Sequence, residues 1–189
     1  MKNLAIIPAR SGSKGLKDKN IKNLAGKPLL VYSINAAIDS GLYDTVHVST
    51  DSEIYADIAE KNGADVPFLR NAETATDTSS TWDAVKYVLQ EYEKQGKTFD
   101  VITVLQPTSP LRTSRDIKNA YSFFCEKKAN MISAVCEMEH SPLWSNTLPD
   151  DLSMSSFEDD EVALLPRQSL PIYYRENGNT FLFDVLGKR

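Results

Sequence analysis

The stretch that decides the fold lies close to the N-terminus and runs Ile6-Ile7-Pro8-Ala9-Arg10-Ser11-Gly12-Ser13-Lys14-Gly15. Residues 4–8 are apolar and predict a fully buried strand, and the residues after them predict a loop. The two glycines let the loop adopt conformations in which backbone N–H groups converge on an anion. Arg10 adds a bidentate fork and Lys14 a point charge. The stretch therefore favours a phosphate-binding loop at a strand end, and a plain surface loop remains the alternative from local chemistry alone.

Apolar runs alternate with amphipathic segments along the rest of the chain, as in βαβ units that form a parallel sheet. Capping residues mark helix ends, for example Gly41 after one helix and Thr113 with Asp116 at the start of another. These patterns predict a Rossmann-like α/β fold, with an open, mostly parallel sheet and helices on both faces. Strands are expected at residues 4–8, 45–49, 100–105, 131–136 and 180–185, with a short extended segment at 64–68. Helices are expected at 28–40, 52–61 and 80–95, and a fourth follows Thr113 and runs to about residue 128.

Composition excludes several classes of protein. A length of 189 residues fits one domain, and a net charge of −5 gives no general attraction to nucleic acid or to an anionic membrane. The first apolar run is too short for a signal peptide or a membrane span, and the two cysteines lack metal-ligand spacing. We therefore expect a soluble cytoplasmic protein. Residues 1–189 are expected to form a single domain, with residues 139–175 as an excursion from it, because periodicity weakens there.

Short collinear motifs along nearly the whole chain resemble those of the acylneuraminate (CMP-sialic acid) cytidylyltransferase family. The resemblance implies a nucleotidyltransferase-type fold and an enzyme that transfers CMP from CTP to a nine-carbon acidic sugar such as N-acetylneuraminate, with release of pyrophosphate. The motifs are Ile6 to Asn20, Gly26-Lys27-Pro28-Leu29, Val48-Ser49-Thr50-Asp51, Phe68-Leu69-Arg70, Ala75 to Ser80, Leu105 to Arg112, Pro166-Arg167-Gln168 and Tyr174 to Gly178.

The same resemblance implies a set of nucleotide-binding residues. Arg70 is placed against cytosine, whose O2 and N3 atoms accept hydrogen bonds. From local sequence alone, Asn20 is equally a turn or cap residue, and Thr81 belongs to a run of helix-capping residues. The implied nucleotide-binding residues are Ala9, Arg10, Ser13, Lys14, Asn20, Arg70, Ser79 and Thr81.

A second set of residues is implied for the acidic sugar. An arginine fork suits the carboxylate of such a sugar, and Arg167 is implied to be catalytic together with Arg10 and Lys14. The segment from Gln106 to Pro110 favours the nine-carbon branch over the eight-carbon sugar Kdo, whereas Asn179 departs from the family pattern and leaves the preferred acyl group open. The implied sugar-binding residues are Gln106, Arg167, Arg175, Asn177 and Phe181.

The resemblance also implies Mg²⁺ or another divalent cation, and a homodimer formed through residues 139–175. Apolar residues of that excursion, Leu143, Trp144, Leu164 and Leu165, are awkward on a monomer surface, and Arg167 is expected to act across the dimer interface. The family draws its metal-binding carboxylates from a segment beyond the position of Arg189, so no metal ligand is named.

Three alternatives stay open. In the first, the acceptor sugar is legionaminic or pseudaminic acid, which differ from N-acetylneuraminate in small substituents. In the second, the chain is a truncated nucleotide-binding homologue with little catalysis. A dinucleotide-dependent oxidoreductase ranks last, because the glycine fingerprint of that class is absent.

Overall fold

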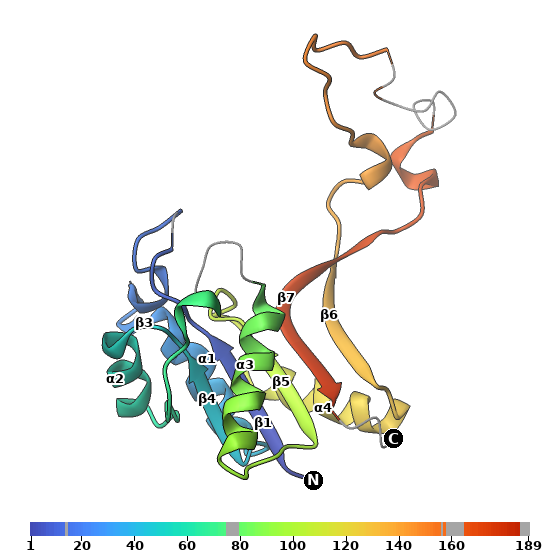
Figure 1. The fold of residues 1–189 in the computed structure, drawn as a ribbon. Coiled ribbons are helices and arrows are strands. Elements are labelled where there is room, and N and C mark those ends of the chain that lie inside the picture. Colours follow the sequence, from blue (N-terminus) through green and yellow to red (C-terminus); the bar gives the residue numbers. More distant parts are fainter. Residues whose placement is uncertain (14, 75–79, 156, 158–164, 186–189) are drawn as a thin grey trace. The chain divides into compact units, whose positions relative to one another are not determined.

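The structure is a computed structural model that describes residues 1–13, 15–74, 80–155, 157 and 165–185 (Figure 1). The chain divides into two compact units. Residues 1–134, together with those from 178 onward, form the first unit, and residues 135–177 form the second.

A five-stranded sheet forms the centre of the first unit, in the order β4-β1-β5-β7-β6. Strand β1 pairs in parallel with β4 on one side and with β5 on the other, and β7 runs antiparallel to β5. The expected mostly parallel sheet is therefore confirmed. Its strands are β1 (Asn3–Pro8), β4 (Thr45–Ser49), β5 (Val101–Leu105), β6 (Met131–Glu137) and β7 (Tyr174–Asp184).

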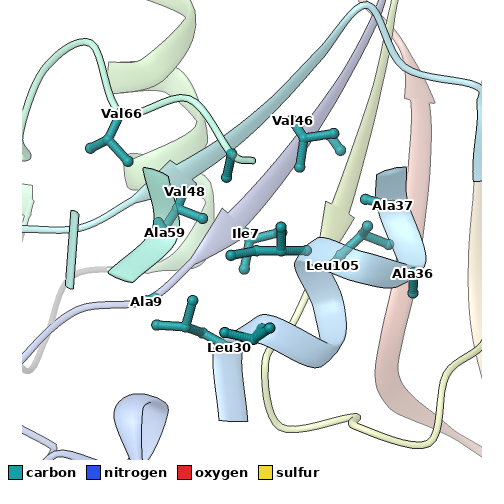
Figure 2. Close-up of a cluster of buried hydrophobic side chains, with 14 of the residues drawn as sticks. Ile7, Ala9, Leu30, Ala36, Ala37, Val46, Val48, Ala59, Val66 and Leu105 are labelled. Carbon is teal, nitrogen blue, oxygen red and sulfur yellow. The ribbon is translucent and has the colours of Figure 1, made fainter. Parts of the chain in front are cut away.

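Helices cover both faces of this sheet, as expected. On one face, Leu4 and Ile6 of β1 pack against Val85 and Val88 of α3, which lies across the sheet in Figure 1. On the other face, Ile7 packs with α1, α2 and α4, and Figure 2 shows it among Ala9, Leu30 and Leu105. Alternation along a strand produces this division, because successive side chains point to opposite faces. The helices are α1 (Leu29–Ser40), α2 (Glu53–Lys61), α3 (Thr81–Lys94) and α4 (Ser114–Lys127).

Capping residues define the N-termini of α3 and α4 and the C-terminus of α1. Ser80 and Asp83 form a reciprocal capping box at the start of α3, and Thr113 with Asp116 forms another at α4. Gly41 ends α1 with a φ of 64°, a left-handed conformation that glycine adopts without steric cost. The sequence prediction of these helix boundaries is confirmed to within one or two residues.

Short elements that the sequence did not predict lie around the sheet. A hairpin of β2 (Asn23–Leu24) and β3 (Lys27–Pro28) precedes α1. Single-turn 3₁₀ helices occur at η1 (Lys19–Ile21) and η2 (Ala72–Thr74). The extended segment expected at residues 64–68 pairs with the sheet through one parallel bridge between His47 and Asp65.

The second unit contains two further 3₁₀ helices, η3 (Pro142–Trp144) and η4 (Arg167–Ser169). The two sides of the excursion meet where the Met138 N–H donates to the Tyr173 carbonyl at 2.8 Å. Strand β7 begins at Tyr174, whereas the sequence predicted a start at residue 180. The earlier start was missed because the first half of the strand is polar and shows no alternation of apolar residues. Within the described part of the chain, no helix has the length and apolarity needed to span a membrane.

Candidate functional site

A cleft of about 510 Å³ opens in the first unit, where β1 and β5 end. Loops and helix ends that follow different strands converge on it, which is the usual position for a ligand crevice in an open α/β sheet. The residues that line it are Pro8, Arg10, Ser13, Gly15, Leu16, Lys19, Asn20, Arg70, Ser80, Thr81, Gln106, Pro107 and Thr108.

The loop after β1 supplies one wall of the cleft. Gly12 has a φ of 59°, so the backbone turns in the left-handed region as its sequence suggested. The neighbouring Ser11 N–H, however, donates to a carboxylate oxygen of Asp51 at 2.7 Å, so it is already engaged within the protein. Ala9 is buried, and its N–H donates to the Ser49 carbonyl at 2.9 Å. Lys14 lies outside the described residues.

Asn20 holds this loop through a hydrogen bond to its backbone. Its side chain is 6% exposed, and its Nδ2 donates to the Arg10 carbonyl at 3.1 Å. Asn20 lines the cleft as well, so the structural and the ligand-binding interpretations of this residue are compatible. Lys19, which belongs to the same N-terminal motif, also lines the cleft.

Arg70 approaches the cleft from beyond the end of β4. Its Nε donates to Ser49 Oγ at 2.8 Å, and its backbone N–H donates to the Thr50 carbonyl at 2.8 Å. Burial lowers the pKa of Arg70 to about 10, while the carboxylate of Asp51 opposes this shift and the charge of Arg10 adds to it. Arg70 therefore stays positively charged at neutral pH and shares the cleft with Arg10.

The N-terminus of α3 closes another side of the cleft with Ser80 and Thr81. A helix N-terminus carries partial positive charge and favours anions. The Oγ of Ser80 accepts from the Asp83 N–H at 3.1 Å, which is the capping role expected for this run of residues. Ser79 lies outside the described residues.

Gln106 follows β5 directly and contributes the last wall. Its carbonyl oxygen accepts from both terminal nitrogens of Arg112 at 3.4 Å and from Ser33 Oγ at 3.3 Å. Arg112 is 4% exposed, and no local pattern indicates this burial because the residue lies in a predicted loop. The side chain of Gln106 lies beside Gly178, where an added Cβ would stand 2.6 Å from its Oε1.

The other residues predicted for the sugar are Phe181 of the first unit and three residues of the second unit. Phe181 packs against Trp82 with ring centroids 6.0 Å apart. Arg167, Arg175 and Asn177 belong to the second unit. Their role in sugar binding therefore stays a prediction.

The described residues do not form a metal centre. Among them, no group of three or more His, Cys, Asp or Glu side chains could hold a metal ion. Asp51 is the acidic residue tied to the cleft loop, and both of its carboxylate oxygens accept from Ser11. These residues do not fit a magnesium site by themselves.

A charged cleft at the carboxyl ends of a mostly parallel sheet is typical of nucleotide-binding α/β proteins. The chain belongs to the cytidylyltransferase family, whose model matches residues 4–185.

Two curated relatives illustrate the family. The chain is 38% identical over 184 residues to the N-acylneuraminate cytidylyltransferase of Streptococcus agalactiae serotype V, covering 96% of this chain and 43% of that relative. It is 38% identical over 177 residues to the CMP-N,N'-diacetyllegionaminic acid synthase of Legionella pneumophila, covering 94% of this chain and 73% of the relative. The chain thus spans less than half the length of the streptococcal relative.

A solved structure supports the fold independently. The structure of CMP:2-keto-3-deoxy-manno-octonic acid synthetase complexed with CTP matches with a TM-score of 0.72 at 17% identity, covering 97% of this chain and 74% of that one. Likeness at this identity concerns the fold, and the predicted nucleotidyltransferase-type architecture is confirmed.

Proposed function

We propose that this chain transfers CMP from CTP to a nine-carbon acidic sugar of the sialic acid type and releases pyrophosphate. The observation that carries the proposal is the convergence of Arg10, Arg70 and the N-terminus of α3 on one cleft. Two guanidinium groups and a helix N-terminus provide positive charge that attracts the negatively charged phosphates of a nucleoside triphosphate. The names of the curated relatives support the acceptor class.

In the proposed reaction, the anomeric hydroxyl of the sugar attacks the α-phosphorus of CTP in line. A P–O bond to the sugar forms, the bond to the bridging oxygen of the β-phosphate breaks, and pyrophosphate leaves while the hydroxyl proton passes to solvent. Such a transfer depends on positioning and charge stabilisation rather than on covalent catalysis. Arg10, with Ser13 and Lys14, acts on the phosphates, and Arg70 acts on the cytosine.

The other side chains have roles within the same proposal. Ala9, Asn20, Ser79 and Thr81 contact the nucleotide. Gln106, which lines the cleft, binds the sugar. Arg167, Arg175, Asn177 and Phe181 also bind the sugar, and Arg167 assists the transfer.

We also propose that the reaction requires a divalent cation, Mg²⁺ in particular, and takes place in the cytoplasm, where CTP is made. The requirement is tested by adding EDTA and then restoring activity with excess Mg²⁺. No protein ligand is assigned to the ion.

A homodimer belongs to the same proposal. The second unit exposes large apolar side chains, and Leu152 (69% exposed), Ile172 (63%) and Tyr174 (61%) are prominent among them. Exposed apolar surface of this kind is typical of an interaction site. Residues 139–175 are the proposed interface, and light scattering after size exclusion tests it: a monomer at all concentrations would contradict the assignment.

Pyrophosphate release measured over a matrix of substrates tests the central proposal. CTP and UTP are each paired with N-acetylneuraminate, legionaminic acid, pseudaminic acid and Kdo. We expect release with CTP and a nine-carbon sugar, and little with UTP or Kdo. Turnover with legionaminic or pseudaminic acid alone would retain the reaction and correct the acceptor. CTP binding without turnover on any sugar would support a nucleotide-binding protein instead, and absence of CTP binding would contradict both.

A further inference from the structure

Ser11 and Asp51 join the ends of two neighbouring strands. Ser11 follows β1 and Asp51 follows β4, and these strands pair in parallel. The Ser11 N–H donates to Asp51 Oδ1 at 2.7 Å, and the Ser11 hydroxyl donates to Oδ2 at 2.7 Å. The carboxylate therefore holds one residue of the loop through both its backbone and its side chain.

Ser11 lies between two residues of the loop that line the cleft. Arg10 precedes Ser11 and Ser13 follows two positions later, and both line the cleft. Gly12, with its φ of 59°, turns the chain between them. Fixing Ser11 therefore fixes the direction in which Arg10 leaves β1 and the point at which the loop turns.

A carboxylate beside an anion site requires an explanation, because its charge repels phosphate. Burial alone would raise the pKa of Asp51, but the two hydrogen bonds from Ser11, with a contribution from Arg70, leave it below its usual value. Asp51 is thus ionised at neutral pH. Its oxygens are occupied by Ser11, and its charge offsets the mutual repulsion of Arg10 and Arg70.

We propose that Asp51 is a positioning residue for the phosphate-binding loop, acting through Ser11 and not through contact with the nucleotide or with a metal. This inference rests on the proposed function, since it assigns Asp51 to the binding of the CTP phosphates. It predicts that the geometry of the contact matters more than the negative charge.

The variants Asp51→Asn and Asp51→Ala separate geometry from charge. An asparagine carbonyl can accept from the Ser11 N–H, and its amide can donate to the Ser11 hydroxyl, so D51N keeps both contacts without the charge. D51A removes both contacts. We expect kcat/KM for CTP to fall by about 10²-fold in D51A, as a misplacement of about 1 Å produces, and D51N to retain most of it. KM for the sugar should be unchanged in both, because none of the residues proposed for sugar binding belongs to this loop.

A double-mutant cycle shows whether Asp51 acts through Ser11. Ser11→Ala keeps the backbone contact and loses the hydroxyl contact, so its effect on CTP should be smaller than that of D51A. In the D51A background, S11A should have no further effect, since residues that act as one unit are not additive. Additive losses would overturn the proposal, as would equal losses in D51N and D51A, which would indicate a metal-binding or catalytic carboxylate.

Asp57→Ala is the matched control, since it removes an exposed carboxylate from the nearby helix α2 and should leave CTP kinetics unchanged. Hydrogen exchange at the Ser11 amide gives a readout that needs no nucleotide: D51A should accelerate exchange, and D51N and D57A should not. If the wild-type chain fails to bind CTP, the proposed function fails, and unchanged exchange in D51A would refute the contact itself. If the wild-type chain turns over and D51A matches it, only the positioning role of Asp51 is wrong.

Discussion

Gly178 and Gln106 are in such close contact that no side chain fits between them. A Cβ on Gly178 would lie 2.6 Å from Gln106 Oε1, and the residue has a φ of 68°. Gly178→Ala should therefore displace the Gln106 side chain in addition to introducing backbone strain. If Gln106 binds the sugar as proposed, KM for the sugar should rise about tenfold or more, because one lost hydrogen bond to a charged ligand is worth about 1.5–3 kcal/mol. The affinity for CTP should be unchanged.

The control variant Gly41→Ala separates the effect of backbone strain from the effect of displacing the Gln106 side chain. Gly41 has a similar φ of 64°, and a Cβ there meets no atom within 4 Å. Both variants should lose about 1–2 kcal/mol of unfolding free energy from the left-handed backbone, measured by urea titration, and only G178A should change the sugar KM. Equal KM values for the sugar in the two variants would show that Gln106 does not bind the sugar.

We expect His47 to make the stability of the fold depend on pH. The ring is fully buried, with Nδ1 3.1 Å from the Tyr92 hydroxyl. Burial, with smaller contributions from Arg70 and Lys97, lowers the pKa of His47 from 6.5 to about 3. Between these values the unfolded chain binds more protons than the folded chain, so the unfolding free energy should fall as the pH falls below 6.5. Between pH 7 and pH 5 we expect a loss of about 2 kcal/mol.

Urea unfolding of His47→Gln at the same pH values checks this assignment. The variant lacks the titrating ring, so its unfolding free energy should change much less between pH 7 and pH 5, whatever its absolute stability. His140→Gln, which changes the exposed histidine of the second unit, is the control and should follow the wild type. Parallel pH profiles for wild type and H47Q would show that His47 is not the group responsible.

Arg10 should matter for turnover more than for stability. Arg10 lines the cleft in which the phosphates are proposed to bind, and removal of one donor to such a group typically costs about 10²–10³-fold in rate. We expect Arg10→Ala to show this loss in kcat for pyrophosphate release. Arg115→Ala, which removes an exposed arginine from α4, should retain the wild-type rate. A normal rate in R10A would exclude its proposed role.

The two capping boxes offer a test of the helix α3 N-terminus. Ser80 and Thr113 cap their helices in the same way, but only Ser80 lines the cleft. Ser80→Ala and Thr113→Ala should each cost about 1 kcal/mol of stability. CTP affinity should fall in S80A alone, as measured by calorimetry. Unchanged affinity in S80A would indicate that this helix end does not contact the nucleotide.

Much of the sheet could be predicted from sequence because buried parallel strands are short, continuous apolar runs. Strands β1 and β5 are largely of this form, whereas β4 was recognised from its β-branched residues. In all three strands every residue is buried except Pro8. The cleft loop and the helix caps could also be predicted, since glycine, serine, threonine and basic residues carry local signals. The beginning of β7 could not, because Arg175, Glu176 and Asn177 are polar and exposed in a strand that is identified by its pairing.

Contacts between strand ends carried no local signal. Nothing in the spacing of Ser11 and Asp51 indicates that they meet, because the contact depends on the register of β1 with β4. The burial of Arg112 is likewise set by tertiary structure, through Ser33 of α1 and the carbonyl of Gln106. Sequence therefore indicated several of the residues that line the cleft, but not the side chains that hold them in place.

The placement of β7 in the interior of the sheet has a consequence for biosynthesis. On one side, β5 pairs with β1, which is synthesised long before it. On the other side, β5 pairs with β7, for example Val101 with Asp184, and β7 is synthesised much later. While the ribosome is still adding the residues of the second unit, β5 presents an unpaired edge, which is a site for association with other chains. Chaperone capture of the nascent chain should therefore be strongest in this interval and should end once residues 180–184 have emerged.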